Sequence, residues 1–227
     1  MFKFLLVILV LFFSPRGLIS YESTYSDIDL LGWKVKVSDA LWKRDSTLAK
    51  QTISLLINKL KDIYSVVPEP ALSDIKQITI WIDNDSPHDR AMQYHPSRQW
   101  LSEHGYNPEK AKCVEISHPN LFISWAQKQP WMVLHELAHG YHDLVLGYQD
   151  SSILYAYRNA LSRKMYKHIR RNDGTNQDAY ALSNEKEYFA ELSEAYFGEN
   201  DFFPFNREEL AKYDTIGYSA IRRAWQR

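Results

Sequence analysis

The sequence predicts an α+β protein in which a small mixed sheet packs on a buried helix and a mainly helical C-terminal half follows. Three observations predict it. Short segments with the alternation or β-branched content of strands all fall within the first 125 residues. A strongly apolar segment with helical length, residues 130–146, lies just past the middle. Two further helical segments, 152–170 and 184–198, come after it.

The N-terminus is typical of a secretory signal. Lys3 precedes an unbroken apolar run from Phe4 to Phe13, and a break at residues 14–17 follows. Because this run is too short for a comfortable membrane span, residues 1–20 are expected to be a cleaved signal peptide, with an uncleaved anchor as the alternative. Residues 21–227 then form a single domain, which is expected to be secreted, periplasmic or extracellular without stable membrane insertion.

Charge and cysteine content narrow the function classes. Residues 1–20 hold two basic residues, Lys3 and Arg16, and no acidic one, so the mature chain has 25 basic and 28 acidic residues and a formal charge of −3. That balance gives no electrostatic footprint for nucleic acid. About 207 residues suffice for one domain with its own core. The single cysteine, Cys113, cannot form an internal disulfide.

The first half of the mature chain is expected to supply the sheet. Strands are predicted at residues 33–37, 78–82, 112–116 and 121–125. One of the last two could form a sheet edge beside the central helix, where an extended peptide would bind by main-chain hydrogen bonds. A helix capped by Asp45 or Ser46 should run to Ile63. Loosely held chain is expected at 21–31, and an aromatic loop at 88–107.

The central helix carries a metal-binding pattern. His135 and His139 lie one turn apart on one helix face, so both imidazoles could reach one Zn²⁺ at about 2.0–2.1 Å. Glu136 lies about 100° around the helix from His135, where it could hold a metal-bound water without binding the metal. Pro130 and Gly147 frame the helix at roughly 130–146.

Two histidines on a helix can also be ordinary packed residues. The residues around Glu136 are apolar, including Val133, Leu134 and Leu137, which would place its carboxylate in a buried stripe. A buried carboxylate without a partner is costly, and a metal-bound water would supply one. The pattern therefore favours a metal site over packed core histidines.

A catalytic zinc site needs a third protein ligand. The best candidate lies in the segment 184–198, a predicted helix with Asn184 or Ser183 as its cap and Gly198 as its stop. Its acidic residues recur at i, i+4 and i+7 and form one stripe: Glu187, Glu191 and Glu194. Like charges stacked on a solvated face repel one another, whereas a dication facing them would stabilise them.

The pair of motifs resembles the gluzincin metallopeptidases of the anthrax lethal factor type, which include the secreted Pro-Pro endopeptidases. The shared features are His135-Glu136-x-x-His139 and the segment Glu187-Tyr188-Phe189-Ala190-Glu191. This resemblance implies a zincin-like fold and one zinc ion, held by His135, His139 and Glu187. It implies that Glu191 orients a ligand histidine from outside the metal shell. It also implies that Tyr180, seven residues before Glu187, stabilises the developing oxyanion.

Two other residues compete for a role at the metal. The segment 174–180 faintly resembles the Gly-Thr…Asp…Tyr element of aspzincins, which would make Asp178 a ligand, but thirty-nine positions separate Asp178 from His139. His142 shares the face of His135, yet two turns separate them, too far for one ion. His142 is therefore expected to support the site from a distance or only to pack.

The sequence favours a zinc metalloendopeptidase acting on a peptide or protein substrate. Glu136 would be the general base and Tyr180 the oxyanion donor. The alternative is a catalytically silent secreted module that binds peptides or proteins on a peptidase scaffold, although such a module needs neither a base nor an oxyanion donor. Hydrolysis of a non-peptide amide would use the same ligands equally well.

Overall fold

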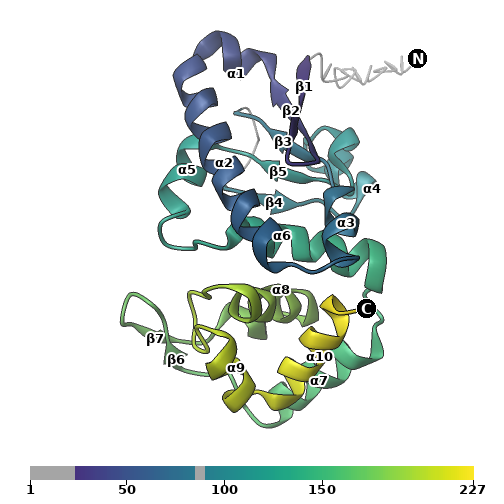
Figure 1. Cartoon of the computed structure of the whole chain (residues 1–227), viewed down its shortest axis with the longest axis vertical. Helices are drawn as coiled ribbons and strands as arrows, with labels where there is room; N and C mark the ends of the chain where they lie inside the picture. The colour runs from purple at the N-terminus through teal and green to yellow at the C-terminus, as the bar shows by residue number, and fades with distance from the viewer. Residues whose placement is uncertain (1–23, 85–89) are drawn as a thin grey trace, which may run out of the picture.

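The computed structural model describes residues 24–84 and 90–227, so the expected signal peptide, 1–20, lies outside the described residues. The fold is α+β, with a mixed five-stranded sheet in the first half and a mainly helical C-terminal half (Figure 1). The central helix α6 (Met132–Tyr141) lies between the two halves. In the described ranges, no helix combines the length and the apolar character that a membrane crossing requires.

The sheet consists of five strands: β1 (Tyr25–Leu30), β2 (Trp33–Ser38), β3 (Ile80–Ile82), β4 (Gln93–Tyr94) and β5 (Val114–Ile116). Their spatial order is β1-β2-β3-β5-β4. The three inner strands are parallel, and each edge strand is antiparallel to its neighbour. The edge strand β4 contacts α6, which places one open edge of the sheet beside the central helix.

The two faces of the sheet differ in chemistry. Val35, Ile80 and Val114 lie side by side in the register, and all three are fully buried in the apolar core. Successive side chains of a strand point to opposite faces, so Trp81 and Glu115, which are also paired, face the other way. Glu115 is fully buried there, and it therefore needs polar partners.

Those partners form what we call the sheet-back cluster: Asp83, His95, Lys110 and Glu115. Lys110 Nζ lies 2.5 Å from Glu115 Oε1 and 2.7 Å from Asp83 Oδ2, and His95 Nε2 lies 2.7 Å from Glu115 Oε2. Burial acts to raise the pKa of Glu115, but His95 and Lys110 outweigh it and lower that pKa. Burial likewise acts to raise the pKa of Asp83, but Lys110 outweighs burial and lowers that pKa. The ammonium group of Lys110 is thus the counter-charge of the two buried carboxylates.

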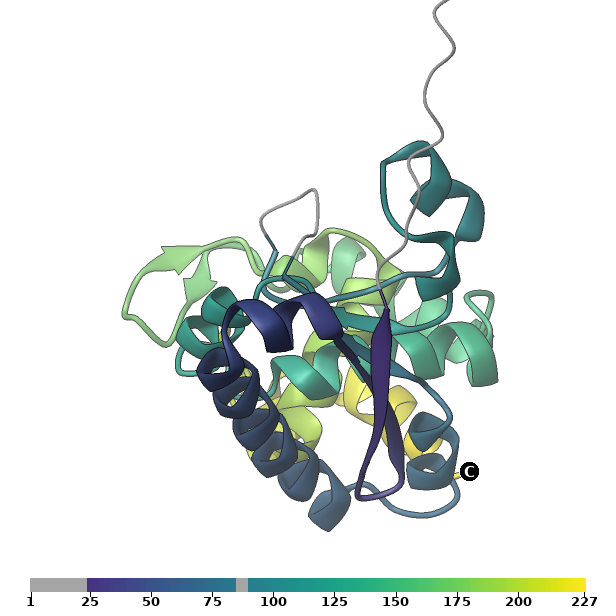
Figure 2. The same cartoon turned by 90° about the horizontal axis from the view of Figure 1, so that it is seen from above.

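The helices of the first half are α1 (Asp39–Arg44), α2 (Ser46–Val66), α3 (Ala71–Lys76), α4 (Arg98–Glu103), η1 (Pro108–Lys110) and α5 (Pro119–Trp125). The long helix α2 runs along one flank of the sheet (Figure 2). Its predicted start is confirmed, because the Asp45 side chain accepts a hydrogen bond from Leu48 N at 2.9 Å. The helix continues one turn beyond the predicted end.

Three expectations for the first half are wrong. Residues 121–125 belong to helix α5 and not to a strand, because Pro119 occupies the first helical turn, where its fixed φ and missing N–H suit a helix. The segment expected to be loosely held contains strand β1, which pairs with β2 along its whole length. The expected loop 88–107 contains both the edge strand β4 and helix α4, so β4 and not 112–116 or 121–125 is the edge beside α6.

After α6 the chain forms the π-helical turn η2 (His142–Leu146), α7 (Ser151–Ser162), β6 (Ile169–Arg170), β7 (Asn176–Gln177), η3 (Tyr180–Leu182), α8 (Glu185–Phe197), α9 (Arg207–Tyr213) and α10 (Thr215–Trp225). The helix predicted at 152–170 is wrong beyond residue 162. Lys164, Tyr166 and His168 have positive φ, which an α-helix does not permit. Tyr166 is buried instead, and its hydroxyl donates to Asp214 at 2.9 Å.

Two glycines let the halves meet closely around α6. A Cβ on Gly140 would lie 2.5 Å from Ile78 Cδ1, so this position brings the helix directly onto the sheet half. A Cβ on Gly198, at the end of α8, would lie 1.8 Å from the Trp131 ring. Both contacts leave no room for a larger residue without movement. They fix α6 and α8 relative to each other and to the sheet.

Candidate metal centre

Helix α6 and the turn η2 together span residues 132–146, as the sequence predicted, and Gly147 follows with a φ of +79°. His135 and His139 lie one turn apart on this helix and are both 8% exposed. Their rings sit edge to face, with centroids 4.8 Å apart. The slight exposure leaves the ring edges accessible from one side while the helix itself is buried.

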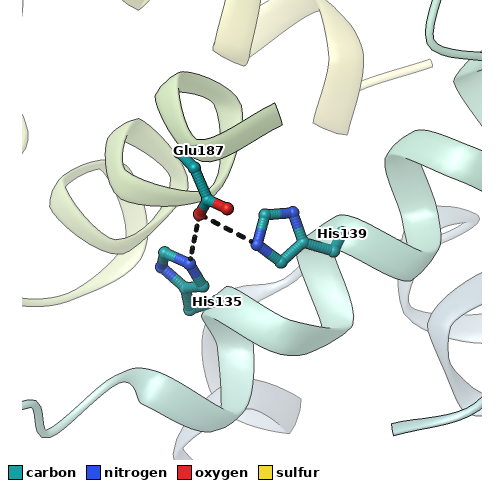
Figure 3. A group of neighbouring side chains, drawn as sticks. All are labelled: His135, His139 and Glu187. Atoms are coloured by element: carbon teal, nitrogen blue, oxygen red, sulfur yellow. Dashed lines mark hydrogen bonds and ion pairs between the residues drawn. The ribbon is translucent and has the colours of Figure 1, made fainter. Parts of the chain in front are cut away.

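Helix α8 brings the third candidate ligand to the histidines. Its predicted cap is confirmed, because the Asn184 side chain accepts hydrogen bonds from Lys186 N and Glu187 N. Glu187 thus lies in the first turn, facing α6. One carboxylate oxygen, Glu187 Oε2, lies 3.1 Å from His135 Nε2 and 3.1 Å from His139 Nε2 (Figure 3).

These three side chains fit a divalent metal ion. Their donor atoms all lie within 4.8 Å of one another. Ligand atoms held about 2.1 Å from a tetrahedral ion lie roughly 3.4 Å apart, close to the 3.1 Å separations found here. Two imidazole nitrogens and one carboxylate oxygen are also a donor set that zinc accepts. The set, which we call the metal cluster, could therefore hold a metal ion.

The electrostatics of the metal cluster match a cation site. Burial acts to raise the pKa of Glu187, but hydrogen bonds with His135 and His139 outweigh it and hold that pKa well below its ordinary value. Burial acts to lower the pKa of His135, but the carboxylates of Glu187 and Glu194 outweigh burial and raise that pKa well above its ordinary value. The metal-free site thus attracts a proton to His135. A metal ion binding there would displace that proton.

The nearest outer partner of His135 is Glu194. His135 Nδ1 lies 2.6 Å from Glu194 Oε1, whereas Glu191 Oε1 lies 3.9 Å away, beyond hydrogen-bond distance. A proton on Nδ1 donated to Glu194 leaves Nε2 free to bind a metal, which is the usual carboxylate–histidine–metal arrangement. Glu194 was visible in the sequence as the i+7 member of the acidic stripe, but spacing alone did not show which member reaches the ring.

A second group of potential ligands shares the same histidine. His135, Glu191 and Glu194 also have donor atoms within 4.8 Å of one another. A neutral imidazole offers one lone pair, so His135 cannot bind a metal through Nε2 and through Nδ1 at once. The contact of Nδ1 with Glu194 therefore fits an outer hydrogen bond to the first site better than a separate metal site.

Glu191 and Glu194 are buried carboxylates with little compensation. Burial raises the pKa of Glu191 well above its ordinary value, and the neighbouring Glu194 raises it further. Burial also raises the pKa of Glu194, although the contact with His135 opposes the shift. Two like charges this close and this dry cannot both be ionised cheaply. A nearby cation would relieve that cost.

The expected catalytic residues lie at the rim of the metal cluster. Glu136 Oε2 accepts a hydrogen bond from Tyr94 N of the edge strand at 2.7 Å, which fixes the carboxylate between α6 and β4. The Tyr180 ring lies 6.4 Å from the His135 ring and is 47% exposed. Burial and the nearby Glu187 raise the pKa of Tyr180, which keeps its hydroxyl protonated and able to donate.

The two rival residues lie apart from the metal cluster. Asp178 Oδ1 accepts a hydrogen bond from His168 N at 2.9 Å, and Asp178 belongs to neither group of potential ligands. His142 is fully buried between Tyr148 and Phe189. Burial lowers the pKa of His142 to about 4, and the nearby His139 contributes. His142 is thus a buried residue that packs between two aromatic rings and stays neutral near pH 7.

Two cavities open on either side of the metal cluster, with volumes of about 680 and 480 Å³. The larger reaches from the edge strand to the β6–β7 hairpin, and the smaller extends along α4. Both are bordered by the same four residues: Arg90, His135, Glu136 and Tyr180. His135 thus borders both cavities, and the whole metal cluster borders the smaller one.

The resemblance noted from the sequence rests on this chain's own motifs. Comparisons with protein-family models, with curated proteins and with solved structures find no match to the chain. The geometry supports a His/Glu cluster that could hold a metal ion and that resembles a His-Glu-x-x-His helix with a distant Glu ligand.

Proposed function

We propose that the protein is a secreted zinc metallopeptidase of the gluzincin type, with a zincin-like fold. One observation carries the proposal: two histidines and a carboxylate converge with their donor atoms within 4.8 Å, and Glu136 stands beside them in an open cleft. A purely structural site would need neither the cleft nor the adjacent carboxylate. The signal-like composition of residues 1–20 supports secretion, and the donor set supports one zinc ion.

The residues can be assigned roles in hydrolysis of a peptide bond. Zinc held by His135, His139 and Glu187 would supply Lewis acidity and lower the pKa of a bound water. Glu136 takes a proton from the attacking water and returns it to the leaving amine. Tyr180 donates a hydrogen bond to the oxyanion that develops on the scissile carbonyl. Glu194 holds His135 in the tautomer that exposes Nε2.

The edge strand β4 supports an extended peptide as the substrate. Ala91 O accepts from Ser117 N, and His95 N donates to Cys113 O, so these residues turn their main-chain groups toward β5. Because such groups alternate along an antiparallel strand, those of Met92 point away from β5, toward the cleft. Met92 also borders the larger cavity. A substrate strand could add to the sheet there.

The test is a Glu136→Gln variant assayed on a peptide library with cleavage products read by mass spectrometry. The parent should cleave peptides, and the variant should lose on the order of 10²–10⁴-fold in turnover while retaining its zinc. Glu103→Gln on the exposed surface of α4 is the matched control and should leave turnover unchanged. Full activity of Glu136→Gln would contradict the mechanism. If the parent hydrolysed non-peptide amides but none of the library peptides, its substrate would be an amide of another class.

A further inference from the structure

The larger cavity, of about 680 Å³, is lined by three buried carboxylates, of which the proposed mechanism uses only Glu194. We call these three carboxylates the acid cluster: Glu191, Glu194 and Asp201. Glu191 and Asp201 are each 1% exposed, and all three border the cavity. The acid cluster lies behind His135, on the side of the cleft away from α4.

Two oxygens of the acid cluster lack a partner within the described ranges. Asp201 Oδ2 is held by Arg171 Nε and Nη2 at 3.1 and 3.0 Å, and more weakly by Gln129, but Asp201 Oδ1 makes no hydrogen bond. Glu191 Oε2 makes none either. A buried acceptor left unpaired is costly, and both of these belong to side chains that line the same cavity. Both oxygens are themselves buried, so a donor entering the cavity would supply the hydrogen bonds that they lack.

The rest of the cavity selects the kind of donor. Its walls include four apolar side chains from different elements: Leu121, Trp125, Met132 and Phe202. Its charged lining has an acidic excess, with five carboxylates against two guanidinium groups, those of Arg90 and Arg171. Apolar walls over a carboxylate floor suit a side chain with an aliphatic stem and a cationic end. Lysine and arginine have that form.

A bare metal ion is the other cation that carboxylates accept. Asp201 belongs to neither group of side chains whose ligand atoms lie within 4.8 Å of one another in the described part of the chain. Asp201 therefore does not join Glu191 and Glu194 in a three-ligand group of the kind that the metal cluster forms. An ammonium or guanidinium group offers several donors and reaches the unpartnered oxygens by a flexible stem, so it fits this arrangement better.

We propose that this cavity is a specificity subsite that accepts a lysine or arginine side chain of the substrate, next to the bond that is cut. The inference rests on the proposed function, because the substrate must be a peptide lying in the cleft. Glu191 and Asp201 accept hydrogen bonds from the cationic end, and the apolar walls cover its stem. Arg171 holds Asp201 in place and leaves Oδ1 free.

Binding tests the subsite without requiring turnover. The probes are acetylated, amidated hexa-alanine peptides with one central lysine or one central norleucine, titrated by calorimetry into zinc-loaded Glu136→Gln protein. The lysine peptide should bind on the order of tenfold or more tightly, because charge-assisted hydrogen bonds to buried acceptors are strong. Adding Asp201→Asn should abolish most of that preference and leave norleucine binding unchanged.

Two further variants separate the subsite from general effects. Asp178→Asn removes one negative charge from the exposed rim of the same cavity and should leave the preference intact. Glu191→Gln replaces the other unpartnered carboxyl group by an amide, which offers one acceptor fewer, without touching Arg171, so it should weaken the preference even if Asp201→Asn fails to fold. Elemental analysis of the Asp201→Asn protein should show the same zinc content as its parent.

Several results would overturn the inference. Equal affinity for the two peptides, or no binding of either, excludes a cation subsite. If Asp178→Asn and Asp201→Asn lower the preference for lysine equally, the preference comes from the overall negative potential of the cleft and not from a subsite. A second metal ion per chain that depends on Asp201, with no preference for lysine, assigns the cavity to that ion. Lysine-selective binding in a protein whose parent cleaves no peptide would instead retain the subsite and reject the peptidase activity.

Discussion

The molecule buries two sets of carboxylates, one behind the sheet and one between α6 and α8. In the sheet-back cluster, Lys110 lies within 2.7 Å of both Asp83 and Glu115, and the pKa values of these carboxyl groups are lowered. Around the metal cluster, Glu191 and Glu194 have raised pKa values, because burial outweighs their contact with His135. The carboxylates of the first set are paired with a cation of the chain itself, Lys110. Those of the second set could be paired with a cation that binds from outside the chain.

This difference separates a structural role from a functional one. Both sets are almost fully buried, so burial alone does not distinguish them. They differ in local charge balance, because, among the described residues, only the first set has a lysine beside it. A buried ion pair that is complete within the chain positions segments, here η1 against the sheet, whereas an incomplete one is a candidate binding site.

The largest expected effect comes from removing the internal cation. Lys110→Met should cost about 3–5 kcal/mol in the free energy of unfolding, because it leaves Asp83 and Glu115 buried without a counter-charge. Urea unfolding with zinc present would measure it. Lys112→Met, which removes an exposed ion pair with Asp143, is the control and should cost about 1 kcal/mol or less. A small cost for Lys110→Met would mean that the sheet-back cluster is not held by its cation.

The next prediction concerns the partner of His135. Glu194→Gln should weaken zinc binding about 10–100-fold, because the ring loses its carboxylate partner. Glu191→Gln should weaken it less, since Glu191 lies 3.9 Å from the ring. Competition with a chelator of known affinity would rank the two variants. The reverse order would restore Glu191 as the residue that orients His135.

His142 supplies a smaller, pH-dependent effect. Its pKa is about 4 in the folded protein and about 6.5 when unfolded, so between these values the unfolded chain binds more protons. Stability therefore increases with pH through this window and is fully present above it. From pH 7 to 5 the metal-free protein should lose about 2 kcal/mol through His142.

The variant His142→Phe should remove this part of the pH dependence. Phenylalanine fits the apolar contacts with Tyr148 and Phe189 and carries no titrating nitrogen. Chemical unfolding of parent and variant at pH 5 and 7, both with zinc chelated, would show the difference. His104→Phe at the exposed end of α4 should leave the pH dependence of the parent in place. An unchanged slope in His142→Phe would contradict the assignment.

The sequence predicted those elements whose signals are local. The cap and acidic stripe of α8, the spacing of His135 and His139, and the start of α2 at Asp45 all depend on residues within a few turns. Helix α5 could have been predicted from Pro119. The end of α7 could not, because Tyr166 leaves the helical path to reach Asp214, which lies 48 residues away in the chain.

The same limit applies to the site. Glu187 could be chosen from the acidic stripe and the resemblance to gluzincins, but the choice between Glu191 and Glu194 as the partner of His135 depends on how α8 packs against α6. The unpartnered oxygens of the acid cluster depend on Asp201, which carries no motif and follows α8 in an irregular segment. Contacts between distant segments, and the charge balance they create, become visible only in three dimensions.

The central claim is that the carboxylates and histidines between α6 and α8 take up zinc as their missing cation. Elemental analysis of the purified protein beside Glu187→Ala and Glu185→Ala tests it most directly. Glu185 lies in the same turn of α8 and in neither group of potential ligands, so its variant is the matched control. The account predicts about one zinc per chain in the parent and in Glu185→Ala, and a large loss in Glu187→Ala. Equal zinc in all three proteins, or none in the parent, would contradict it.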